Sequence, residues 1–541
     1  MSNNITFVTG IWDLKRGEAK PGWNRSFDHY KEHFRNLLTD LKDFNMIIYV
    51  DPSMESFVWQ HRSKENTQIV FHAKEQFKGN FFPFFDKVQE IRTDPKWYNK
   101  VGWLKDSTQA SLEYYNPMVM SKMFLLHNAK ITSPFNDDYM YWIDGGLTNT
   151  MSLGYFQDET VLKNLKKISN KFLFICFPYV TDTEIHGFDI RGMRRFSGCS
   201  NVNRVARGGF FGGHKDYISE ANGLYYNLLN DSLNENLMGT EESIFTIMTY
   251  KEPTKYKFEM IDGNGLIYKF FEDLKEPMYK AKSHKDVSLY IITYNAPEQV
   301  QMVLDSFEKY DRKFITETNL ILINNSLDEK YFPQYEQICE TYDIEEYRHN
   351  NIGICGGRQW AAEHFHNSKA DYMLFFEDDM LLDLKGKCPF GFSKHVSNPF
   401  TNFLDIMDKE QYSFLKLCFS EFYGDNSKQW AWHNVKGKQK EEFFGSVSEK
   451  PQTKFTAIKS YEGIPYAEGE IYYCNWPHII GKEGNKKCFM DTVWDHPYEQ
   501  TWMSHIFQLT RKKEVNPGIL LSSPFTHNRI IHYAGQERRE N

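Results

Sequence analysis

The chain has 541 residues, which exceeds what one hydrophobic core usually organises and favours two large domains. Its formal net charge of -8 at pH 7 excludes a global basic field of the kind that attracts nucleic acid or an anionic membrane surface. Hydrophobic residues make up 41% of the chain and are mixed with charged ones, which excludes an intrinsically disordered protein.

The sequence contains no recognisable membrane or export signal. No stretch approaches the ~20 apolar residues that a helix needs to cross a bilayer, and the segment from Met1 to Asn4 lacks a basic and apolar leader. We therefore expect a cytoplasmic protein without stable membrane insertion, or one in the host cytoplasm if its source is a virus. The eight cysteines form no CxxC pair, so we expect reduced thiols and neither disulfides nor a zinc site.

The first half of the chain alternates predicted strands and helices. Two β-rich runs, Ile5 to Gly10 and Asn45 to Val50, enclose a segment from Phe27 to Leu41 with apolar residues at helical spacing. This order predicts a parallel sheet covered by helices. Pro117 to Leu126 is predicted as a further helix, and Tyr139 to Ile143 as a strand that runs into a carboxylate.

The same pattern restarts in the second half. The polar segment from Lys275 to Asp286 predicts the boundary between two domains. Val287 to Thr293 and Leu320 to Ile323 are predicted strands, and Pro297 to Tyr310 is an amphipathic helix between them. A helix is also expected from about Arg358 to Phe365, after a glycine-containing loop.

An acidic triplet is the most informative motif. The apolar strand that begins at Ala370 ends in Glu377, Asp378 and Asp379. Clustered carboxylates repel one another and resist desolvation, and they match the oxygen ligands of Mg²⁺ or Mn²⁺ in phosphate sites. The triplet therefore predicts a metal–diphosphate site beyond the carboxyl ends of the strands, where open α/β sheets bind ligands. The alternative is a solvated acidic turn.

From Val287 onward the chain resembles the family 2 glycosyltransferases, which use nucleotide sugars and have the GT-A fold. The resemblance rests on four motifs in the expected order: Ile291-Ile292-Thr293-Tyr294-Asn295-Ala296-Pro297, Leu322-Ile323-Asn324-Asn325-Ser326-Leu327-Asp328, Asn350-Asn351-Ile352-Gly353-Ile354-Cys355-Gly356-Gly357-Arg358, and Phe376-Glu377-Asp378-Asp379. Glu377 stands where the family has an aspartate. The alternatives from the residues alone are an ordinary turn at Asn324 to Ser326 and an ordinary glycine-containing strand–helix connection.

This resemblance implies site residues in the second half. The implied nucleotide-sugar ligands are Thr293, Tyr294, Asn295, Asn325, Asp328, Gly353, Gly357, Arg358, Glu377 and Asp378. Asp379 is the implied ligand of Mn²⁺ or Mg²⁺, helped by a late histidine, His532 or His527. The implied catalytic base is Glu499 or else Asp495, because an inverting transfer needs a group that takes the acceptor's proton. Either carboxylate has helix capping as its alternative role.

The first half, from about Ile5 to Phe271, is similar to the HtrL/YibB-like proteins, which are associated with bacterial surface-polysaccharide synthesis. The matching segments are Thr6-Phe7-Val8-Thr9-Gly10, Tyr115-Asn116-Pro117-Met118-Val119-Met120-Ser121-Lys122, Tyr141-Trp142-Ile143-Asp144-Gly145-Gly146, and Arg207-Gly208-Gly209-Phe210-Phe211-Gly212-Gly213. The similarity implies nucleotide-sugar ligands at Thr9, Gly10, Lys122 and Arg207, a metal ligand at Asp144, and catalytic carboxylates at Glu241 and Glu242.

The first half departs from a metal-binding pattern at Gly146, which occupies the second acidic position. His214 is a candidate second ligand, and five arginines offer protein cations in place of a metal: Arg191, Arg194, Arg195, Arg204 and Arg207. The alternative is a solvated basic loop. Thr240 precedes the two glutamates and is also a candidate helix cap.

Taken together, the sequence predicts an α/β protein with two GT-A-like domains in tandem, residues 1–278 and 287–541. The predicted function is a metal-assisted, bifunctional glycosyltransferase of polysaccharide biosynthesis that uses nucleotide-diphosphate sugars and a glycan acceptor. One alternative is a phage or viral enzyme that modifies a DNA base or a protein. Another is a single catalytic domain paired with a degenerate carbohydrate-binding domain, for which Gly146 makes the first half the candidate.

Overall fold

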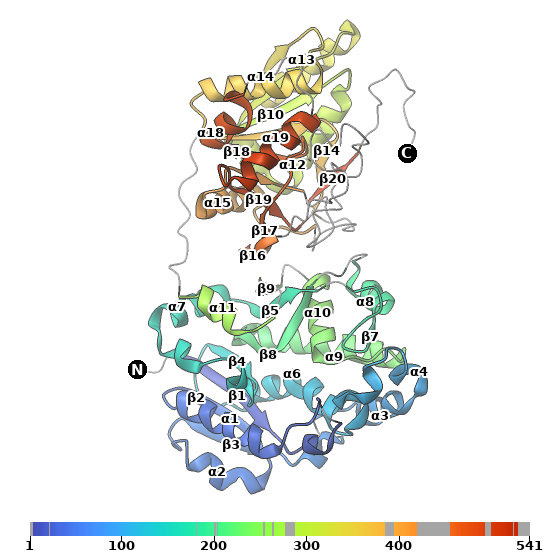
Figure 1. Cartoon of the computed structure of the whole chain (residues 1–541), viewed down its shortest axis with the longest axis vertical. Helices are drawn as coiled ribbons and strands as arrows, with labels where there is room; N and C mark the ends of the chain where they lie inside the picture. Colours follow the sequence, from blue (N-terminus) through green and yellow to red (C-terminus); the bar gives the residue numbers. More distant parts are fainter. Residues whose placement is uncertain are drawn as a thin grey trace. The chain divides into compact units, whose positions relative to one another are not determined.

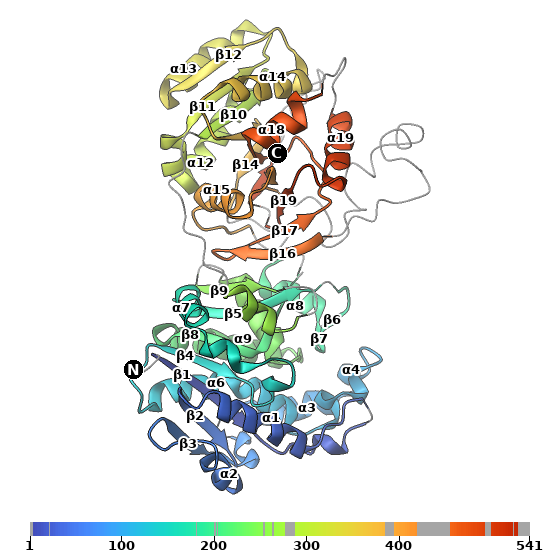
Figure 2. The same cartoon turned by 60° about the vertical axis from the view of Figure 1, so that its left-hand side comes forward.

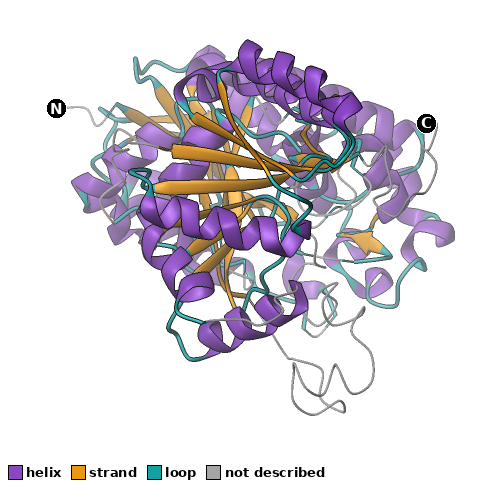
Figure 3. Ribbon diagram, turned by 90° about the horizontal axis from the view of Figure 1, so that it is seen from above, coloured by secondary structure: helices purple, strands orange, loops and turns teal. Residues whose placement is uncertain are grey.

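The computed structural model describes residues 4–20, 22–79, 81–179, 181–199, 202, 204–252, 255–261, 265–275, 287–384, 394–418, 455–492, 499–522 and 524–528. The chain divides into two compact units, Met1–Met278 and Tyr279–Asn541, each with its own sheet (Figures 1 and 2). Helices flank the strands of these sheets, as Figure 3 shows by colour. Among the described residues, no helix is both long enough and apolar enough to span a bilayer.

The N-terminal unit contains a seven-stranded sheet in the order β3-β2-β1-β4-β8-β5-β9. Its strands are β1 (Ile5–Ile11), β2 (Asn45–Val50), β3 (Thr67–Phe71), β4 (Tyr139–Ile143), β5 (Phe172–Pro178), β8 (Arg204–His214) and β9 (Tyr256–Met260). A separate hairpin pairs β6 (Glu184–Ile185) with β7 (Phe188–Asp189). In the sheet, β8 runs antiparallel to both of its neighbours, and all other pairs are parallel.

The helices of this unit are α1 (Phe27–Asp40), α2 (Glu55–Trp59), α3 (Phe85–Thr93), α4 (Pro95–Tyr98), α5 (Thr108–Ser111), α6 (Tyr115–Thr132), α7 (Glu159–Ile168), α8 (Ile190–Ser197), α9 (Ile218–Asn234), α10 (Glu241–Lys251) and α11 (Tyr268–Asp273). Helix α1 begins after Ser26, whose side chain accepts a hydrogen bond from the His29 amide. Its apolar residues Phe34, Leu37 and Leu38 are buried in the core. Helix α6 extends beyond its predicted range because most of its residues are buried.

The C-terminal unit contains a nine-stranded sheet in the order β12-β11-β10-β13-β18-β15-β19-β17-β16. Its strands are β10 (Val287–Thr293), β11 (Asn319–Asn324), β12 (Ile344–Arg348), β13 (Tyr372–Glu377), β15 (Phe414–Lys416), β16 (Phe455–Tyr461), β17 (Ile464–Gly469), β18 (His478–Gly481) and β19 (Pro517–Leu520). Strands β14 (Met380–Leu382) and β20 (Phe525–His527) form a separate antiparallel pair. The helices are α12 (Pro297–Glu317), α13 (Phe332–Tyr342), α14 (Gly353–Asn367), α15 (Pro399–Glu410), α18 (Lys482–Asn485) and α19 (Glu499–Arg511).

Alternate residues of β10 belong to two different cores. Leu289 and Ile291 join a cluster that includes residues of α12 and α15, whereas Tyr290 and Ile292 join one that includes residues of α14 and α19. A strand with both faces buried is expected in an α/β sheet, and the near-continuous apolar run of β10 is its sequence signal. The predicted α/β fold with parallel-rich sheets is therefore confirmed.

The two units share a strand order. In the N-terminal unit the order β3-β2-β1-β4 is parallel, and reversed β8 separates β4 from β5. In the C-terminal unit β12-β11-β10-β13 is parallel, and reversed β18 separates β13 from β15. In both units the reversed strand comes later in the chain than the strand beyond it. Polar residues that follow β1 and β4 in the N-terminal unit, and β10 and β13 in the C-terminal unit, therefore lie at equivalent edges of the two sheets.

Candidate functional site

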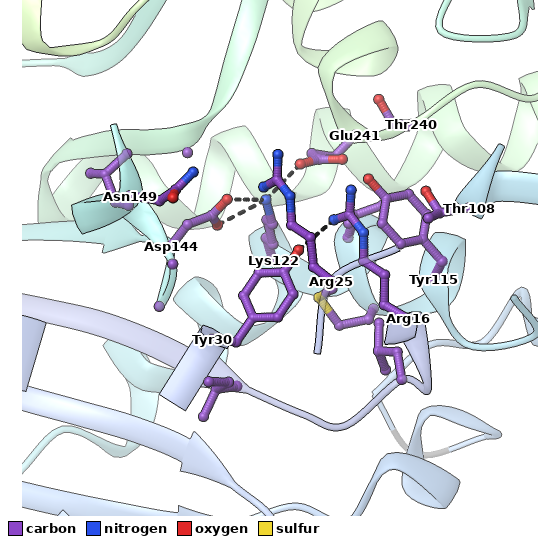
Figure 4. A pocket seen from close by; sticks show the side chains of 18 of the residues that line it. Arg16, Arg25, Tyr30, Thr108, Tyr115, Lys122, Asp144, Asn149, Thr240 and Glu241 are labelled. Carbon is purple, nitrogen blue, oxygen red and sulfur yellow. Dashed lines mark hydrogen bonds and ion pairs between the residues drawn. The ribbon is translucent and has the colours of Figure 1, made fainter. Parts of the chain in front are cut away.

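A pocket of about 590 Å³ lies at the carboxyl ends of β1 and β4 in the N-terminal sheet (Figure 4). Gly10 of β1 and Asp144, which follows β4, form one side of it. Lys122 of α6, Arg207 of β8 and Glu241 of α10 also line it. Because α10 begins at Glu241, the fold brings the start of this helix to the carboxyl ends of the strands. The pocket thus gathers residues from five elements that are far apart in the sequence, and those from four of them are charged.

Lys122 is at the centre of a charge cluster in this pocket. Its Nζ atom lies 2.8 Å from Oδ1 and 3.0 Å from Oδ2 of Asp144, and 2.7 Å from Oε1 of Glu241. It also donates to the carbonyl oxygen of Gly208 at 3.2 Å. Trp142 Nε1 donates to Asp144 Oδ1 at 2.7 Å. The ammonium group therefore bridges two carboxylates and one carbonyl, which accounts for its three protons.

Burial and charge set the protonation of this cluster. Burial alone would lower the pKa of Lys122, but the carboxylates of Asp144 and Glu241 raise it above its ordinary value. Lys122 is therefore a permanent cation at neutral pH. Burial raises the pKa of the Glu241 carboxyl, although the Lys122 ammonium acts in the opposite direction. Removal of the ammonium would consequently leave the Glu241 carboxyl buried without its cation.

Glu242 forms a second group of charges beside the first. Its Oε2 atom lies 2.9 Å from Nε2 of His186 and 3.5 Å from Nη1 of Arg207, and its Oε1 accepts the Gly208 amide at 2.8 Å. Burial tends to raise the pKa of Glu242, but Arg207 and His186 hold it well below its usual range. Burial likewise opposes the protonation of His186, whose pKa the Glu242 carboxylate raises. The two adjacent glutamates therefore differ in their protonation behaviour.

Glycines create the space for this cluster. A Cβ at Gly208 would lie 2.2 Å from Oε1 of Glu241, so a side chain there would displace the glutamate. A Cβ at Gly145 would lie 2.9 Å from the carbonyl oxygen of Gly10. The glycine-rich run from Gly208 and the Asp144-Gly145-Gly146 segment thus bring backbone and charged side chains close together.

Two arginines that the sequence did not suggest also line the pocket. Arg16 donates through Nε to the Trp23 carbonyl oxygen at 3.1 Å and through Nη1 to the Tyr30 hydroxyl at 2.6 Å. Figure 4 shows the guanidinium groups of Arg16 and Arg25 extending into the pocket. Neither pairs with a carboxylate in the part of the chain that the structure describes. Arg16 and Arg25 stand singly in a polar loop, and the sequence around them contains no motif that could have identified them.

The structure separates the other predicted residues of this unit. Thr9 is buried and does not line the pocket. Arg204 is fully buried, and its guanidinium stacks 3.6 Å from the ring centroid of Tyr250. Arg195 pairs with exposed Glu235. Of the five arginines predicted as a cluster, Arg207 alone lines the pocket, because alternation along β8 and the turns of α8 point the others elsewhere.

His214 is at the opposite end of the sheet from Asp144. It pairs in register with Tyr139, the first residue of β4, whereas Asp144 follows the last. The idea that His214 assists Asp144 in metal binding is therefore wrong. The antiparallel direction of β8, which the sequence pattern did not reveal, is the reason.

The C-terminal unit has a smaller pocket of about 280 Å³ at the equivalent edge of its sheet. It is lined by Ile292, Thr293, Tyr294, Asn325, Asn351, Gly353, Ile354 and Glu377. These residues come from the ends of β10, β11 and β13 and from the start of α14. The segment predicted as a glycine loop is the first turn of α14, and Gly357 lets this helix pack on β10, since a Cβ there would lie 2.2 Å from Ile292 Cδ1.

Asp378 does not line this pocket. It is fully buried, and its carboxylate accepts from Thr293 Oγ1 at 2.6 Å and from Gln299 Nε2 at 3.0 Å. Thr293 in turn bonds the Tyr335 hydroxyl at 2.9 Å. Asp378 thus fixes the loop after β10. The prediction that it binds the nucleotide sugar is not supported by its position, because its hydrogen-bonding capacity is used inside the protein.

Asp379 points the other way and meets a histidine. Its Oδ2 atom lies 2.9 Å from Nε2 of His527, which is on β20 next to β14. Asp379 is 1% exposed, whereas the side chain of His527 is 38% exposed, so the pair is reachable from solvent on the histidine side. Carboxylate and imidazole are both donors that Mn²⁺ accepts. His527 was the alternative to His532, which lies outside the described residues, as does Asp495.

Glu499 is the first residue of α19, and its Oε1 accepts the Asn475 amide at 2.9 Å. Burial raises the pKa of Glu499. Burial also raises the pKa of the Cys355 thiol to about 11, and the carboxylates of Glu499 and Glu377 add to this effect. Both carboxylates therefore act electrostatically on Cys355 in the first turn of α14, where Gly353 and Ile354 line the pocket together with Glu377.

Three other predicted ligands have structural contacts instead. Arg358 is fully buried, donates to the Tyr473 hydroxyl at 3.0 Å and lies 3.8 Å from the ring centroid of Phe489. It faces inward from α14, so the prediction that it binds the nucleotide sugar is not supported by its position. Asp328 pairs with exposed Lys330 at 2.6 Å. The backbone amide of Asn295 donates to the Ser326 hydroxyl and its side-chain Oδ1 accepts the Asp328 amide, which ties the loops after β10 and β11 together.

Among the described residues, no group of three or more His, Cys, Asp or Glu side chains has the arrangement of a metal site. In the C-terminal unit, Asp379 and His527 fit two positions of a site that phosphate oxygens and water would complete. In the N-terminal unit, the Asp144 carboxylate is already engaged by the Lys122 ammonium. The two acidic strand ends therefore differ in their capacity for a divalent cation.

Comparison with known families gives one match. The sequence profile of a family described as "Bacterial protein of unknown function (HtrL_YibB)" matches residues 3–273. No curated protein of similar sequence was found.

Partial similarities to solved structures accompany this match. TarS from S. aureus is 16% identical over 25% of this chain and 21% of TarS, with a TM-score of 0.19. GalNAc-T7 with UDP, GalNAc and Mn²⁺ is 11% identical over 47% of each chain, with a TM-score of 0.30. The mannosyltransferase PcManGT from Pyrobaculum calidifontis, with GDP-Man and Mn²⁺, is 14% identical over 27% of this chain and 40% of that enzyme, with a TM-score of 0.21. The chain thus spans less than half the length of each.

Proposed function

The chain belongs to the bacterial HtrL_YibB family, whose function is unknown, and from its two pockets we propose that it is a nucleotide-sugar-dependent glycosyltransferase. Its donors are nucleoside-diphosphate sugars, and its acceptor is a growing glycan. The proposal places donor binding in the C-terminal pocket and a second donor site in the N-terminal pocket, which makes the protein bifunctional. A role in polysaccharide biosynthesis follows from the glycan acceptor.

One observation supports this proposal above the others. Thr293, Tyr294, Asn325, Gly353 and Glu377 line a single pocket although they come from four separate sequence motifs. The family 2 resemblance predicts these motifs to hold the base, ribose and diphosphate of the donor. The pocket lies beyond the carboxyl ends of parallel strands, where α/β sheets bind nucleotides. Topology and motif therefore agree on the same place.

The residues around this pocket have separate roles in the glycosyl transfer reaction. Glu499 accepts the Asn475 amide through Oε1, which leaves Oε2 to take the proton of the acceptor hydroxyl. As the acceptor oxygen attacks the anomeric carbon, the bond to the donor phosphate breaks, and the nucleoside diphosphate departs. Asp379 and His527 would hold a Mn²⁺ or Mg²⁺ ion. The chemistry that such an ion supplies when bound is neutralisation of charge on the departing diphosphate.

The N-terminal unit supports the second half of the proposal by its shared strand order and its acidic pocket. Glu241 and Glu242 are at the start of α10, above the strand ends that correspond to those of the C-terminal site. Glu242 is held as a carboxylate by Arg207 and His186. Because these partners weaken the basicity of Glu242 and Lys122 engages Glu241, both glutamates stay candidates for the catalytic carboxylate of this unit.

Hydrolysis of a panel of UDP-, GDP-, CDP- and dTDP-sugars with Mn²⁺ tests the proposal. We expect Asp379→Ala to abolish turnover at the C-terminal site. Asp343→Asn is the matched control, since Asp343 is exposed and has a left-handed conformation that asparagine tolerates. Absence of Mn²⁺-dependent turnover and of Mn²⁺-dependent nucleotide binding by the intact chain would contradict the proposal.

A single catalytic unit with a carbohydrate-binding N-terminal unit is the second candidate function. It is favoured by Gly146 at the second acidic position and by Lys122 on Asp144. The same assay separates the two cases. If Asp144→Ala leaves every turnover unchanged while Asp379→Ala abolishes all of it, the bifunctional proposal is wrong and the binding-module function stands.

A further inference from the structure

The Lys122 ammonium occupies the position at which a cation would meet the acidic strand end of the N-terminal unit. It lies 2.7 to 3.0 Å from oxygens of both Asp144 and Glu241. A divalent cation needs these oxygens at about 2.0 to 2.6 Å and several more around it. The side chain of Lys122 is 5% exposed and also donates to the Gly208 carbonyl oxygen. Displacing it for an incoming ion would therefore cost free energy.

The surrounding packing also opposes a second carboxylate. A Cβ at Gly146 would lie 3.2 Å from the ring of Tyr30, and one at Gly145 would lie 2.9 Å from the Gly10 carbonyl oxygen. An aspartate at either position would require the neighbouring strand or ring to move. The residues present therefore do not fit a divalent metal site, and the packing accounts for the glycines that replace the second acid.

Arg16 and Arg25 supply positive charge that no described carboxylate neutralises. The other cations of the pocket are already engaged, Lys122 by Asp144 and Glu241 and Arg207 by Glu242. Arg16 lies beside the same cluster, since its guanidinium is 5.9 Å from the ring centroid of Tyr115, which lines the pocket together with Lys122 and Glu241. Guanidinium forks match the paired oxygens of phosphate groups.

A buried acceptor completes the binding site. Gln109 lines the pocket, is 5% exposed, and has an Oε1 atom that receives no hydrogen bond from any described residue. A buried amide oxygen without a donor is costly, and a ligand hydroxyl would satisfy it. The pocket thus offers cations for phosphate and an acceptor for a sugar or ribose hydroxyl.

We propose that the N-terminal pocket binds the diphosphate of a nucleoside-diphosphate ligand without a divalent cation. Arg16 and Arg25 contact the phosphate oxygens, and Lys122 permanently takes the place of the metal on Asp144. The nucleoside part of this inference rests on the proposed glycosyltransferase function, whereas the metal-free diphosphate site stands on the charges of the pocket itself.

Calorimetric titration of the full chain in EDTA tests this inference, with inorganic pyrophosphate and UDP, GDP, CDP, dTDP and ADP as probes. The background is Asp379→Asn, which removes the metal ligand of the C-terminal unit. We expect one site that binds pyrophosphate and at least one nucleotide with unchanged affinity when Mn²⁺ replaces EDTA. Arg16→Ala combined with Arg25→Ala should weaken it by about 100-fold or more, because each charged hydrogen bond is worth roughly ten-fold or more in affinity. Arg35→Ala, an exposed change on α1, is the control.

Two results would overturn the inference: no binding of any probe in EDTA, or binding that survives the double arginine substitution. The proposed function has a separate readout. In the Arg16→Ala/Arg25→Ala chain, Mn²⁺-dependent nucleotide binding reports on the C-terminal unit alone. Its absence contradicts the glycosyltransferase proposal for that unit and leaves the metal-free site intact. Its presence, together with no binding in EDTA by the Asp379→Asn chain that keeps both arginines, contradicts the N-terminal inference only.

Discussion

Both units place an aspartate just beyond the fourth strand of the shared order, and the two aspartates meet different partners. In the N-terminal unit the register of β1 and β4 pairs Val8 with Trp142, which sets Asp144 level with Gly10. In the C-terminal unit Ile292 pairs with Glu377, which sets Asp379 level with Tyr294. The lysine of an adjacent helix contacts the first aspartate, and a histidine from a late strand contacts the second.

This difference shows that the charge of a carboxylate at the same edge of the fold can be compensated in two ways. A buried carboxylate near a phosphate site needs a compensating cation. An ammonium group built into the protein is always present, but it cannot exchange. The imidazole of His527 is itself a metal ligand by type and leaves room beside Asp379 for a metal that arrives with the ligand. The following experiments probe this contrast, from the largest expected effect to the smallest.

Lys122→Met should destabilise the N-terminal unit most. It leaves Asp144 and buried Glu241 without their cation, and breaking a buried pair from one side costs about 3 to 5 kcal/mol. The measurement is urea unfolding of the full chain with a probe in this unit. Lys130→Met, on the same helix, is the control and should cost far less, since among the described residues half-buried Lys130 bonds the Ser219 hydroxyl at 2.8 Å and pairs with no carboxylate. Equal losses in the two variants would remove the special role of Lys122.

Manganese should stabilise only the C-terminal unit. At a concentration 100 times its dissociation constant, a ligand adds about 2.7 kcal/mol to the unfolding free energy. We expect this increment in the wild-type chain and in Asp144→Asn, and its loss in Asp379→Asn or after EDTA treatment. Thermal unfolding with and without Mn²⁺ measures it. An increment that depends on Asp144 and survives Asp379→Asn would reverse the comparison.

Gly208→Ala should disturb the N-terminal cluster through sterics alone. Its Cβ would lie 2.2 Å from Glu241 Oε1, and overpacking of this kind costs about 1 to 3 kcal/mol. Gly223→Ala in α9 is a matched control, because its Cβ would meet no atom within 4 Å. That control should gain about 0.5 to 1 kcal/mol of helix stability. Denaturant midpoints compare the two, and a neutral Gly208→Ala would show that Glu241 has another position available.

The smallest expected effect is a shift in one limb of a pH profile. A base must be deprotonated to act, so turnover at the C-terminal site should rise with pH as Glu499 loses its proton. Because burial raises the pKa of Glu499, this rise should come at higher pH than for an exposed glutamate. Rates of donor hydrolysis across pH in the wild type and in Glu499→Gln measure it. A limb that persists unchanged in Glu499→Gln would exclude Glu499 as its source.

Local sequence patterns were sufficient for much of the fold. Strands β2, β4 and β10 begin and end at the residues predicted from their apolar runs. The acidic residues after β4 and β13 were visible because charge follows a buried strand abruptly. By contrast, reversed β8 and β18 were not predicted, since neither the direction of a strand nor its neighbours in the sheet appear in its own residues.

What the sequence by itself determined about this protein is its α/β class, the places where carboxylates end strands, and the glycines that allow close approach. The tertiary structure alone decided which cation meets each carboxylate, which arginines enter a pocket and which, like Arg358, are buried in the core. The physical reason is distance along the chain: Lys122 and Glu241 are 119 residues apart, and Asp379 and His527 are 148 apart. Such contacts depend on how whole elements pack, and no local pattern encodes them.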